Sequence, residues 1–160
     1  MAAFFASIPF FSALRPTLRS IRKAGPIDVD LSTILPGKMI TVEWQGKPVW
    51  ILRRTPEMIA QLEKPNPELR DPNSQVNQQP HYAQNLWRSR HPDILVLVGI
   101  CTHLGCIPQY QPEKDFLCPC HGSVFDLSGR VFKDVPAPIN LEVPPYYYLD
   151  DNHLRIGVSG

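Results

Sequence analysis

The segments CTHLGC (residues 101–106) and CPCHGS (residues 118–123) decide how this chain is interpreted. Each supplies one cysteine and one histidine at metal-ligand spacing, together with a second cysteine. All four cysteines of the chain lie in these two segments. This set of donors suits a cluster of two irons and two sulfides, in which one iron takes two thiolates and the other takes two imidazoles.

The two segments closely resemble those of the Rieske iron–sulfur subunits of cytochrome bc complexes, the quinol–cytochrome c oxidoreductases. The resemblance covers nearly the whole chain from about residue 27 onward. It implies one [2Fe-2S] cluster of the Rieske type. It also implies an all-β fold, a Rieske-type antiparallel β-sandwich with a small cluster-binding subdomain and one short helix.

The resemblance makes four residues the iron ligands: Cys101, His103, Cys118 and His121. The remaining cysteines, Cys106 and Cys120, are then free to form a disulfide that ties one loop to the other. Two neutral imidazoles in place of two thiolates remove negative charge from around one iron. The reduction potential of such centres is therefore high, about −150 to +300 mV against about −400 mV for a plant-type ferredoxin.

A structural zinc site is the alternative, because zinc accepts the same two cysteines and two histidines. Zinc fingers, however, usually pair cysteine with cysteine and histidine with histidine. The mixed Cys-x-His and Cys-x-x-His pairs with two extra cysteines fit that pattern poorly. A set of plain disulfides beside incidental histidines is a further alternative, and the cluster explains the residues better than either.

Cys106 and Cys120 also favour one branch of the cluster-binding family. Rieske-type ferredoxins and oxygenases generally lack these two cysteines, so the resemblance is to the high-potential, quinol-oxidising branch. Ser123 matches the family serine whose hydroxyl hydrogen-bonds a bridging sulfide. The family often has a tyrosine two positions later, where this chain has Phe125. The missing hydroxyl predicts a reduction potential below that of tyrosine-containing relatives.

Composition limits the other classes of function. The chain has 160 residues, 18 prolines and a formal net charge of +1. This length allows one domain with a sizeable core, and the mixed charges give no sign of nucleic-acid binding. A disulfide between Cys106 and Cys120 would imply either that the domain lies in an oxidising compartment or that the bridge is shielded from reductants. The family location is the inner (plasma) membrane of a bacterium, with the cluster domain on the periplasmic side.

The first residues, MAAFFASIPFFSAL (1–14), are apolar, but a helix of this length spans only about 21 Å of a roughly 30 Å hydrocarbon core. Because relatives carry a full membrane helix here, we expect a partial transmembrane anchor, with a short peripheral segment as the alternative. The basic residues 15–26 are predicted to form a flexible hinge or tether. Residues 27–160 are predicted to form the [2Fe-2S] domain, with its cluster-binding subdomain at about 99–138.

Hydrophobic patterns place short strands along this domain. A hairpin is expected from residues 39–44 and 49–52 around the turn 45–48, and a buried strand at 94–99. Further strands are expected at 27–31, 116–117, 130–132, 141–143, 146–149 and 154–158. Thr55 followed by Pro56 predicts a short helix that ends near Glu63. Residues 64–92 are predicted to be a long surface excursion whose histidines, His81 and His91, are not ligands.

The segment VPAP (135–138) resembles the proline loop that covers the cluster in the family. Pro136 and Pro138 are therefore expected beside the cofactor, although Val135 replaces the usual glycine. Leu104 and Gly105 lie between ligands and correspond to the apolar tip that docks in the quinol pocket. Prolines stiffen such a covering loop with little loss of chain entropy on folding.

The resemblance also implies a mechanism and partners. His103 or His121 would accept a hydrogen bond from a quinol bound in the partner cytochrome b, so that electron and proton transfer are coupled. The head would then swing to a cytochrome c1-type haem within a dimeric membrane complex, without nucleic acid. An alternative is a small Rieske subunit of another periplasmic oxidoreductase, similar to that of arsenite oxidase.

Overall fold

The computed structural model describes residues 25–159. The predicted anchor at 1–14 and nearly all of the predicted tether at 15–26 lie outside the described residues. Within the described range, no helix has both the length and the apolar character needed to cross a membrane.

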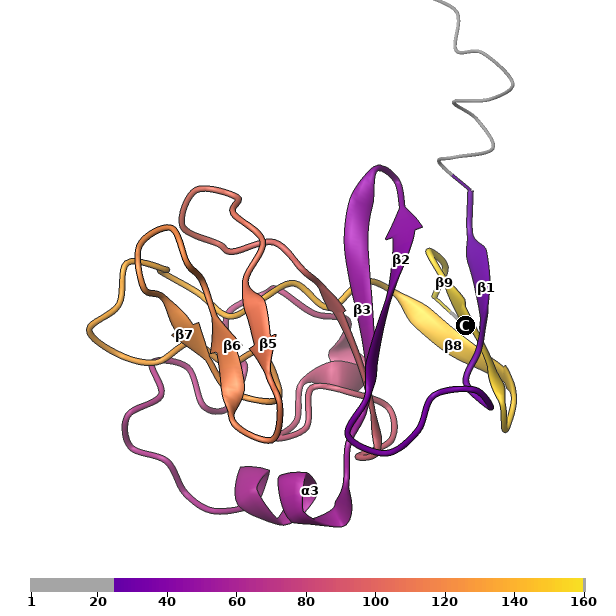
Figure 1. The fold of residues 1–160 in the computed structure, drawn as a ribbon, viewed down its shortest axis with the longest axis horizontal. Coiled ribbons are helices and arrows are strands. Elements are labelled where there is room, and N and C mark those ends of the chain that lie inside the picture. Colours follow the sequence, from indigo (N-terminus) through magenta and orange to yellow (C-terminus); the bar gives the residue numbers. More distant parts are fainter. Residues whose placement is uncertain (1–24, 160) are drawn as a thin grey trace, which may run out of the picture.

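The strands of the described residues form three antiparallel sheets of three strands each. In sheet order they are β1 (Ile27–Asp30), β9 (His153–Ile156) and β8 (Tyr146–Asp150); β2 (Met39–Trp44), β3 (Lys47–Arg53) and β4 (Ile94–Val98); and β5 (Gln109–Gln111), β6 (Asp115–Leu117) and β7 (Val124–Phe125). Figure 1 shows the β5–β6–β7 sheet on one side, the β1–β9–β8 sheet on the other, and the β2–β3 hairpin between them. The predicted all-β antiparallel class is confirmed.

The β2–β3 hairpin is tighter than the sequence pattern indicates. Trp44 pairs with Lys47, which leaves only Gln45 and Gly46 in the turn. Both have positive φ, 52° and 75°, as a two-residue turn matching the twist of the strands requires. The second strand therefore begins at Lys47 rather than at the predicted Val49.

The helix and the buried strand agree with prediction to within a residue. Helix α3 (Pro56–Leu62) is capped at its N-terminus by Thr55, whose side-chain oxygen accepts a hydrogen bond from the Met58 N–H at 3.4 Å. Proline at the first helical position has no N–H to leave unpaired. Strand β4 is buried along its whole length and leads directly into the loop 101–106.

Two predicted strands, 130–132 and 141–143, are wrong. Around the first, the structure has only isolated bridges, Leu69 to Phe132 and Phe125 to Val131. In the second, Leu141 N–H donates to the carbonyl of Gly129. The hydrogen bonds of each segment go to several different neighbours, so no ladder forms, although both segments are largely buried.

The excursion 64–92 contains one short 3-10 helix, η1 (His81–Ala83), and otherwise loops. It is not only a surface feature, because Leu69, Ala83 and Arg88 are buried in the domain. Backbone groups of the excursion form hydrogen bonds to the rest of the domain. Arg70 N–H, for example, donates to the carbonyl of Val131 at 2.9 Å.

One hydrophobic core connects the central sheet to the loops of interest. Its buried members include Trp50 of β3, Phe116 of β6 and Phe125 of β7, together with Cys101 and Cys118. The Trp50 and Phe116 rings stack with centroids 5.2 Å apart. This close packing holds the β5–β6–β7 sheet against the central β2–β3–β4 sheet.

Candidate metal centre

Loop 101–106 is closed by two backbone hydrogen bonds. Cys101 N–H donates to the carbonyl of Cys106 at 2.8 Å, and Gly105 N–H donates back to the carbonyl of Cys101 at 3.0 Å. Gly105 has φ of +83°, and a side chain there would meet nothing within 4 Å. The backbone conformation, not a lack of space, therefore requires glycine at this position.

Loop 118–123 repeats the same backbone pattern. Cys118 N–H donates to the carbonyl of Ser123 at 2.8 Å, and Gly122 N–H donates to the carbonyl of Cys118 at 3.0 Å. Gly122 has φ of +75° and open space beside it. The two segments thus fold into matching turns, each of which holds a cysteine at its start.

The cysteines divide into a bonded pair and a free pair. A disulfide joins Cys106 and Cys120, as predicted, and so ties the two loops together. Cys101 and Cys118 are free and buried, and their side chains are within hydrogen-bonding contact. The Cys118 Sγ lies within 4.8 Å of both disulfide sulfurs. Disulfide sulfurs carry no thiolate charge, so these three sulfurs are not a ligand set.

The two histidines of these loops are in contact with each other. The rings of His103 and His121 have centroids 4.7 Å apart and planes at 82°. His103 Nδ1 is buried and has no hydrogen-bond partner among the described residues, which is costly for a polar atom unless a ligand completes it. His121 is exposed as a residue.

These four side chains fit a [2Fe-2S] cluster. Two free thiols come together at the buried end, and two imidazoles come together at the outer end. An unpartnered nitrogen in a protein interior is the arrangement that coordination to a metal would satisfy. The donor set is two sulfurs and two nitrogens, as in centres whose second iron is bound by histidine.

Ser123 lies beside the thiols. Its hydroxyl oxygen accepts a hydrogen bond from the Ala137 N–H at 3.0 Å, which leaves the hydroxyl proton free to be donated. Burial raises the pKa of the Cys101 thiol, while hydrogen bonds from the His103 amide and the Ser123 hydroxyl oppose this rise. Ser123 therefore stabilises negative charge on a sulfur in this site.

The proline loop 135–138 is attached to both cysteine loops. Ala137 donates to Ser123, as described above, and Thr102 Oγ1 donates to the carbonyl of Ile139 at 2.6 Å. Pro136 and Pro138 themselves are exposed. The left-handed residue of this turn is Asp134, with φ of 57°, so Val135 occupies a position that does not need glycine.

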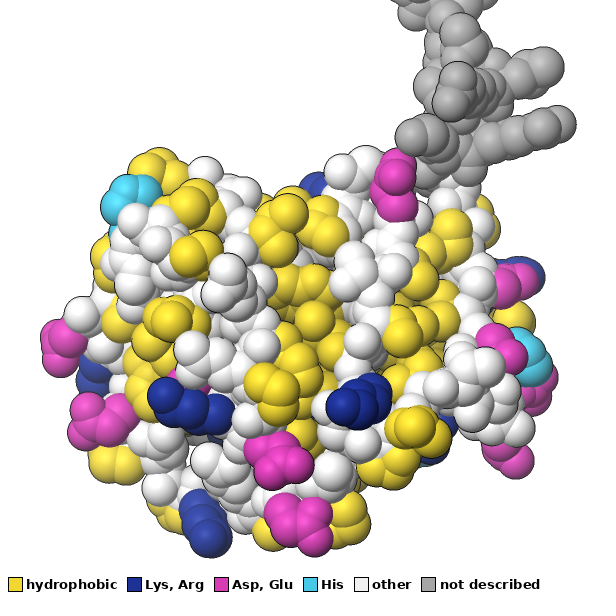
Figure 2. All heavy atoms as spheres, in the orientation of Figure 1, with side chains coloured by type: hydrophobic (Ala, Val, Ile, Leu, Met, Phe, Trp, Pro, Cys, Tyr) yellow, Lys and Arg dark blue, Asp and Glu magenta, His cyan; other side chains and the backbone are white. Residues whose placement is uncertain are grey.

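The outer end of the loops is apolar. Leu104 is 71% exposed and Ile107 is 57% exposed, although free hydrophobic side chains usually avoid water. Figure 2 shows hydrophobic side chains beside a histidine at the end of the molecule that lies next to β6 and β7. Sequence reasoning identified Leu104 but missed Ile107, which directly follows the second cysteine of its loop.

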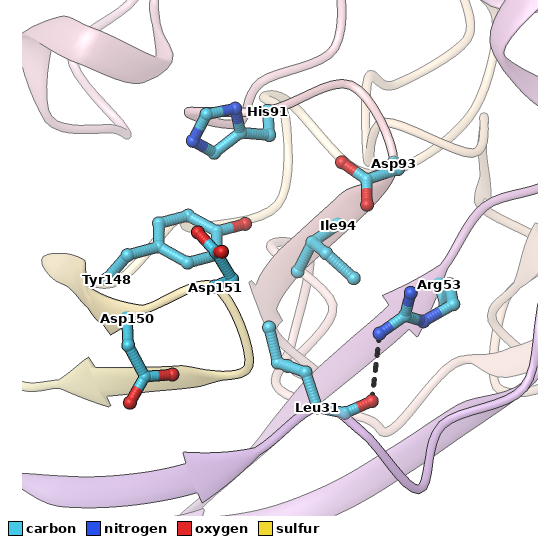
Figure 3. A pocket seen from close by; sticks show the side chains of 8 residues that line it. All are labelled: Leu31, Arg53, His91, Asp93, Ile94, Tyr148, Asp150 and Asp151. Carbon is cyan, nitrogen blue, oxygen red and sulfur yellow. Dashed lines mark hydrogen bonds between the residues drawn. The ribbon is translucent and has the colours of Figure 1, made fainter.

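Two described histidines outside the cysteine loops, His81 and His91, have different surroundings. His91 is exposed and packs its ring against Tyr148, with centroids 4.8 Å apart. The two residues line a cavity of about 380 Å³ together with Arg53 and Asp93. Figure 3 shows these side chains around the cavity. His81 is an exposed residue of η1.

Matching cysteine turns joined by a disulfide, with two histidines in contact, define a protein of the Rieske type. Comparison with known proteins agrees, because the Rieske [2Fe-2S] domain family matches residues 67–145. The chain is 46% identical to the ubiquinol-cytochrome c reductase iron-sulfur subunit of Allochromatium vinosum, over 98% of this chain and 81% of that protein. This chain belongs to the family of ubiquinol-cytochrome c reductase iron-sulfur subunits.

Other comparisons are consistent with this family. The Rickettsia conorii subunit of the same name is 45% identical over 93% of this chain and 80% of its own length. The tobacco cytochrome b-c1 complex subunit Rieske-1 is 47% identical over 82% of this chain, which spans only 48% of that longer protein. A solved structure of a hyperthermophilic respiratory Complex III superimposes with a TM-score of 0.53 at 26% identity, covering 96% of both chains.

Proposed function

We propose that this chain is the one-electron carrier of a quinol–cytochrome c oxidoreductase. The observation that carries the proposal is a pair of loops, joined by a disulfide, that bears two free, buried thiols and two contacting imidazoles. The names of the curated relatives support it over an arsenite-oxidase-like subunit, because they are subunits of the quinol-oxidising complex.

Each ligand has a separate task in this proposal. Cys101 and Cys118 would hold one iron as thiolates, and His103 and His121 would hold the other as neutral imidazoles. The buried, unpartnered Nδ1 of His103 is the nitrogen that faces inward. When bound, the [2Fe-2S] cluster supplies a site that gains and loses one electron.

The histidines couple this electron to a proton. His103 or His121 accepts a hydrogen bond from quinol at the ring nitrogen that does not bind iron. A bound cluster would carry more negative charge when reduced, which would make that imidazole a stronger base and would couple the electron to the proton. Leu104 and Gly105 press the apolar end of loop 101–106 into the quinol pocket, where contact excludes water.

Transfer to the acceptor requires partners outside this chain. The quinol pocket belongs to a cytochrome b subunit, and the electron passes on to a cytochrome c1-type haem. Residues 15–26 act as the tether on which the domain moves between the two, and residues 1–14 contribute to the membrane anchor. The domain works on the periplasmic side of a bacterial inner membrane, within a dimeric complex.

Complementation tests the proposal. Membranes that lack this subunit are supplied with the chain, and quinol-dependent reduction of cytochrome c is measured. We expect the parent to restore activity and His121→Gln to restore none, because one iron loses a ligand. His81→Gln changes an exposed loop histidine and serves as the control. Full activity of His121→Gln would contradict the ligand assignment.

A further inference from the structure

Three arginines are buried in this domain, which is unusual for a residue that is always charged. Arg54, Arg88 and Arg130 are only 2%, 0% and 3% exposed. Among the described residues, the only carboxylate in ion-pair contact with any of them is Asp126, whose Oδ2 lies 2.7 Å from Arg130 Nε and Nη2. The group therefore holds more positive than negative charge inside the protein.

Arg54, at the end of β3, is neutralised by dipoles rather than by an acid. Its Nε donates to the carbonyl of Leu127 at 3.0 Å, and its Nη2 donates to the carbonyl of Trp87 at 2.6 Å. Its Nη1 donates to the carbonyl of Pro92 at 2.7 Å. Burial lowers the pKa of Arg54 to about 10, so the side chain stays cationic at neutral pH.

Arg88 is held in a similar way from the excursion 64–92. Its Nη1 donates to the carbonyls of Ser128 and Gly129, and its Nη2 donates to the carbonyl of Leu141 at 2.6 Å and to Gln79 Oε1 at 3.0 Å. Its Nε is buried without a partner among the described residues. The pKa of Arg88 is also lowered to about 10, mainly by burial.

Other charges act on the group from further away. Asp93 acts on Arg54, and Asp71 acts on Arg88, each favouring the charged guanidinium. Asp93 is exposed and Asp71 is half-buried, so solvent screens their contribution in part. Arg54 and Arg88 also each feel the charge of Arg130. Asp93 and Asp71 therefore weaken the positive field of the arginines, but neither carboxylate is buried among them.

All three arginines hold the segment 126–130, which directly follows β7. Asp126 is three residues beyond Ser123, so the two Cα atoms lie within about 11 Å at full extension. Gln79, the partner of Arg88, lines one cavity of about 740 Å³ together with Cys101 and Thr102. The segment that the buried charges hold therefore begins within about 11 Å, between Cα atoms, of the serine beside the two free thiols.

We propose that Arg54, Arg88 and Arg130 form a buried group of positive charges that stabilises the reduced cluster and raises its reduction potential. This inference rests on the proposed function, because it needs a bound cluster. In an interior with an effective dielectric of about 20, a unit charge acting over about 15 Å would change the reduced-to-oxidised ratio of a one-electron centre several-fold. The effect opposes the loss of the hydroxyl at Phe125.

The test measures the midpoint potential of variants of the purified, cluster-loaded chain by following the paramagnetic signal of the reduced cluster. Arg88→Gln is expected to lower the reduced-to-oxidised ratio at least threefold at a fixed ambient potential, which is about 28 mV for a one-electron couple. Asp126→Asn removes the buried negative charge and keeps the Oδ1 acceptor, so the ratio is expected to rise at least threefold.

Arg88→Lys separates charge from packing. It keeps the cation but loses the guanidinium fork, so we expect reduced thermal stability with a potential within a twofold ratio of the parent. Arg155→Gln is the surface control, since Arg155 forms a partly exposed ion pair with Asp28, and its potential should not change. The shifts of the buried variants should persist in about 1 M salt, where the Debye length is about 3 Å.

Opposite results would overturn the proposal. If Arg88→Gln and Asp126→Asn keep the parent potential, or shift it in the same direction, the arginines act only on structure. Should Arg88→Gln fail to fold, the rise expected for Asp126→Asn decides alone. A parent chain that shows no cluster signal at all would instead contradict the proposed function, and the two failures are thereby distinguished.

Discussion

At the scale of single residues, the site depends on atoms that have one task each. His103 Nδ1 is buried without a partner, and Ser123 Oγ is fixed by the amide of Ala137 so that its proton points elsewhere. Gly105 and Gly122 supply the left-handed backbone that both turns require. A bound group would satisfy the polar atoms of His103 and Ser123, whereas the two glycines are required by the backbone conformation of the turns.

Phe125 provides the first residue-scale prediction. The side chain is fully buried in β7, two positions after Ser123. Phe125→Tyr adds a hydroxyl that can donate to a ligand sulfur, and a net hydrogen bond is worth about 1 kcal/mol. The reduction potential should rise by about 40 mV for a one-electron couple. A redox titration checks this, and a potential that stays the same or falls would mean that the hydroxyl does not donate to a ligand sulfur.

Gly122 provides the second residue-scale prediction. Gly122→Ala places a Cβ on a left-handed residue and should destabilise the fold by about 1–2 kcal/mol. Gly46→Ala in the β2–β3 turn is a matched control, because Gly46 has the same φ of 75° and the same open space. Both variants should lose similar stability on thermal unfolding, but only Gly122→Ala should change the spectrum of the cluster. A changed spectrum in both would contradict this.

At the scale of elements, the two cysteine loops act as one unit because they share a disulfide. Cys106 and Cys120 are 14 residues apart in sequence, and closing a loop of this size removes about 3 kcal/mol of unfolded-chain entropy.

Replacing both cysteines by alanine should therefore lower the free energy of unfolding by about 3 kcal/mol and release the cluster at a lower temperature. Thermal denaturation followed by cluster absorbance measures both effects. The parent treated with a thiol reductant is the comparison, and it should resemble the double variant if the disulfide is accessible. Unchanged stability of the double variant would show that other contacts hold the loops.

The β8–β9 turn provides an element-scale prediction on pH. Hydrogen bonding to Asp150 raises the pKa of His153, so this interaction stabilises the fold at pH below the unfolded pKa of about 6.5. The stability is lost as pH rises through the folded value. His153→Gln should therefore cost stability at pH 5 and little at pH 9, in denaturant titrations at each pH. Because both side chains are exposed, the effect should be small. A larger cost at pH 9 would refute the sign.

The sequence predicted the parts of the structure that short segments determine. The cysteine turns, the hairpin, the capped helix and β4 follow from local patterns, and the disulfide followed from the family resemblance. The strands at 130–132 and 141–143 were wrong because long-range hydrogen bonds to several neighbours replaced a ladder. Nothing local marks Arg54 or Arg88 as buried, since their acceptors are carbonyls that only the folded chain brings together.

At the scale of the whole molecule, the three sheets carry the two loops and the proline loop at one end. The central β2–β3–β4 sheet joins the β5–β6–β7 sheet through the stacked rings of Trp50 and Phe116. Tyr110 of β5 donates its hydroxyl to the carbonyl of Gly37 at 3.1 Å. These contacts hold the sheet that carries the loop 118–123 against the central sheet.

The measurement that tests the central claim most directly is a redox titration of the purified chain, followed by electron paramagnetic resonance. We predict a rhombic signal from a two-iron cluster that appears with a mild reductant such as ascorbate, because histidine-bound centres have high potentials. A signal that needs dithionite would contradict a high-potential quinol oxidant. A colourless protein that contains zinc would contradict the cluster itself.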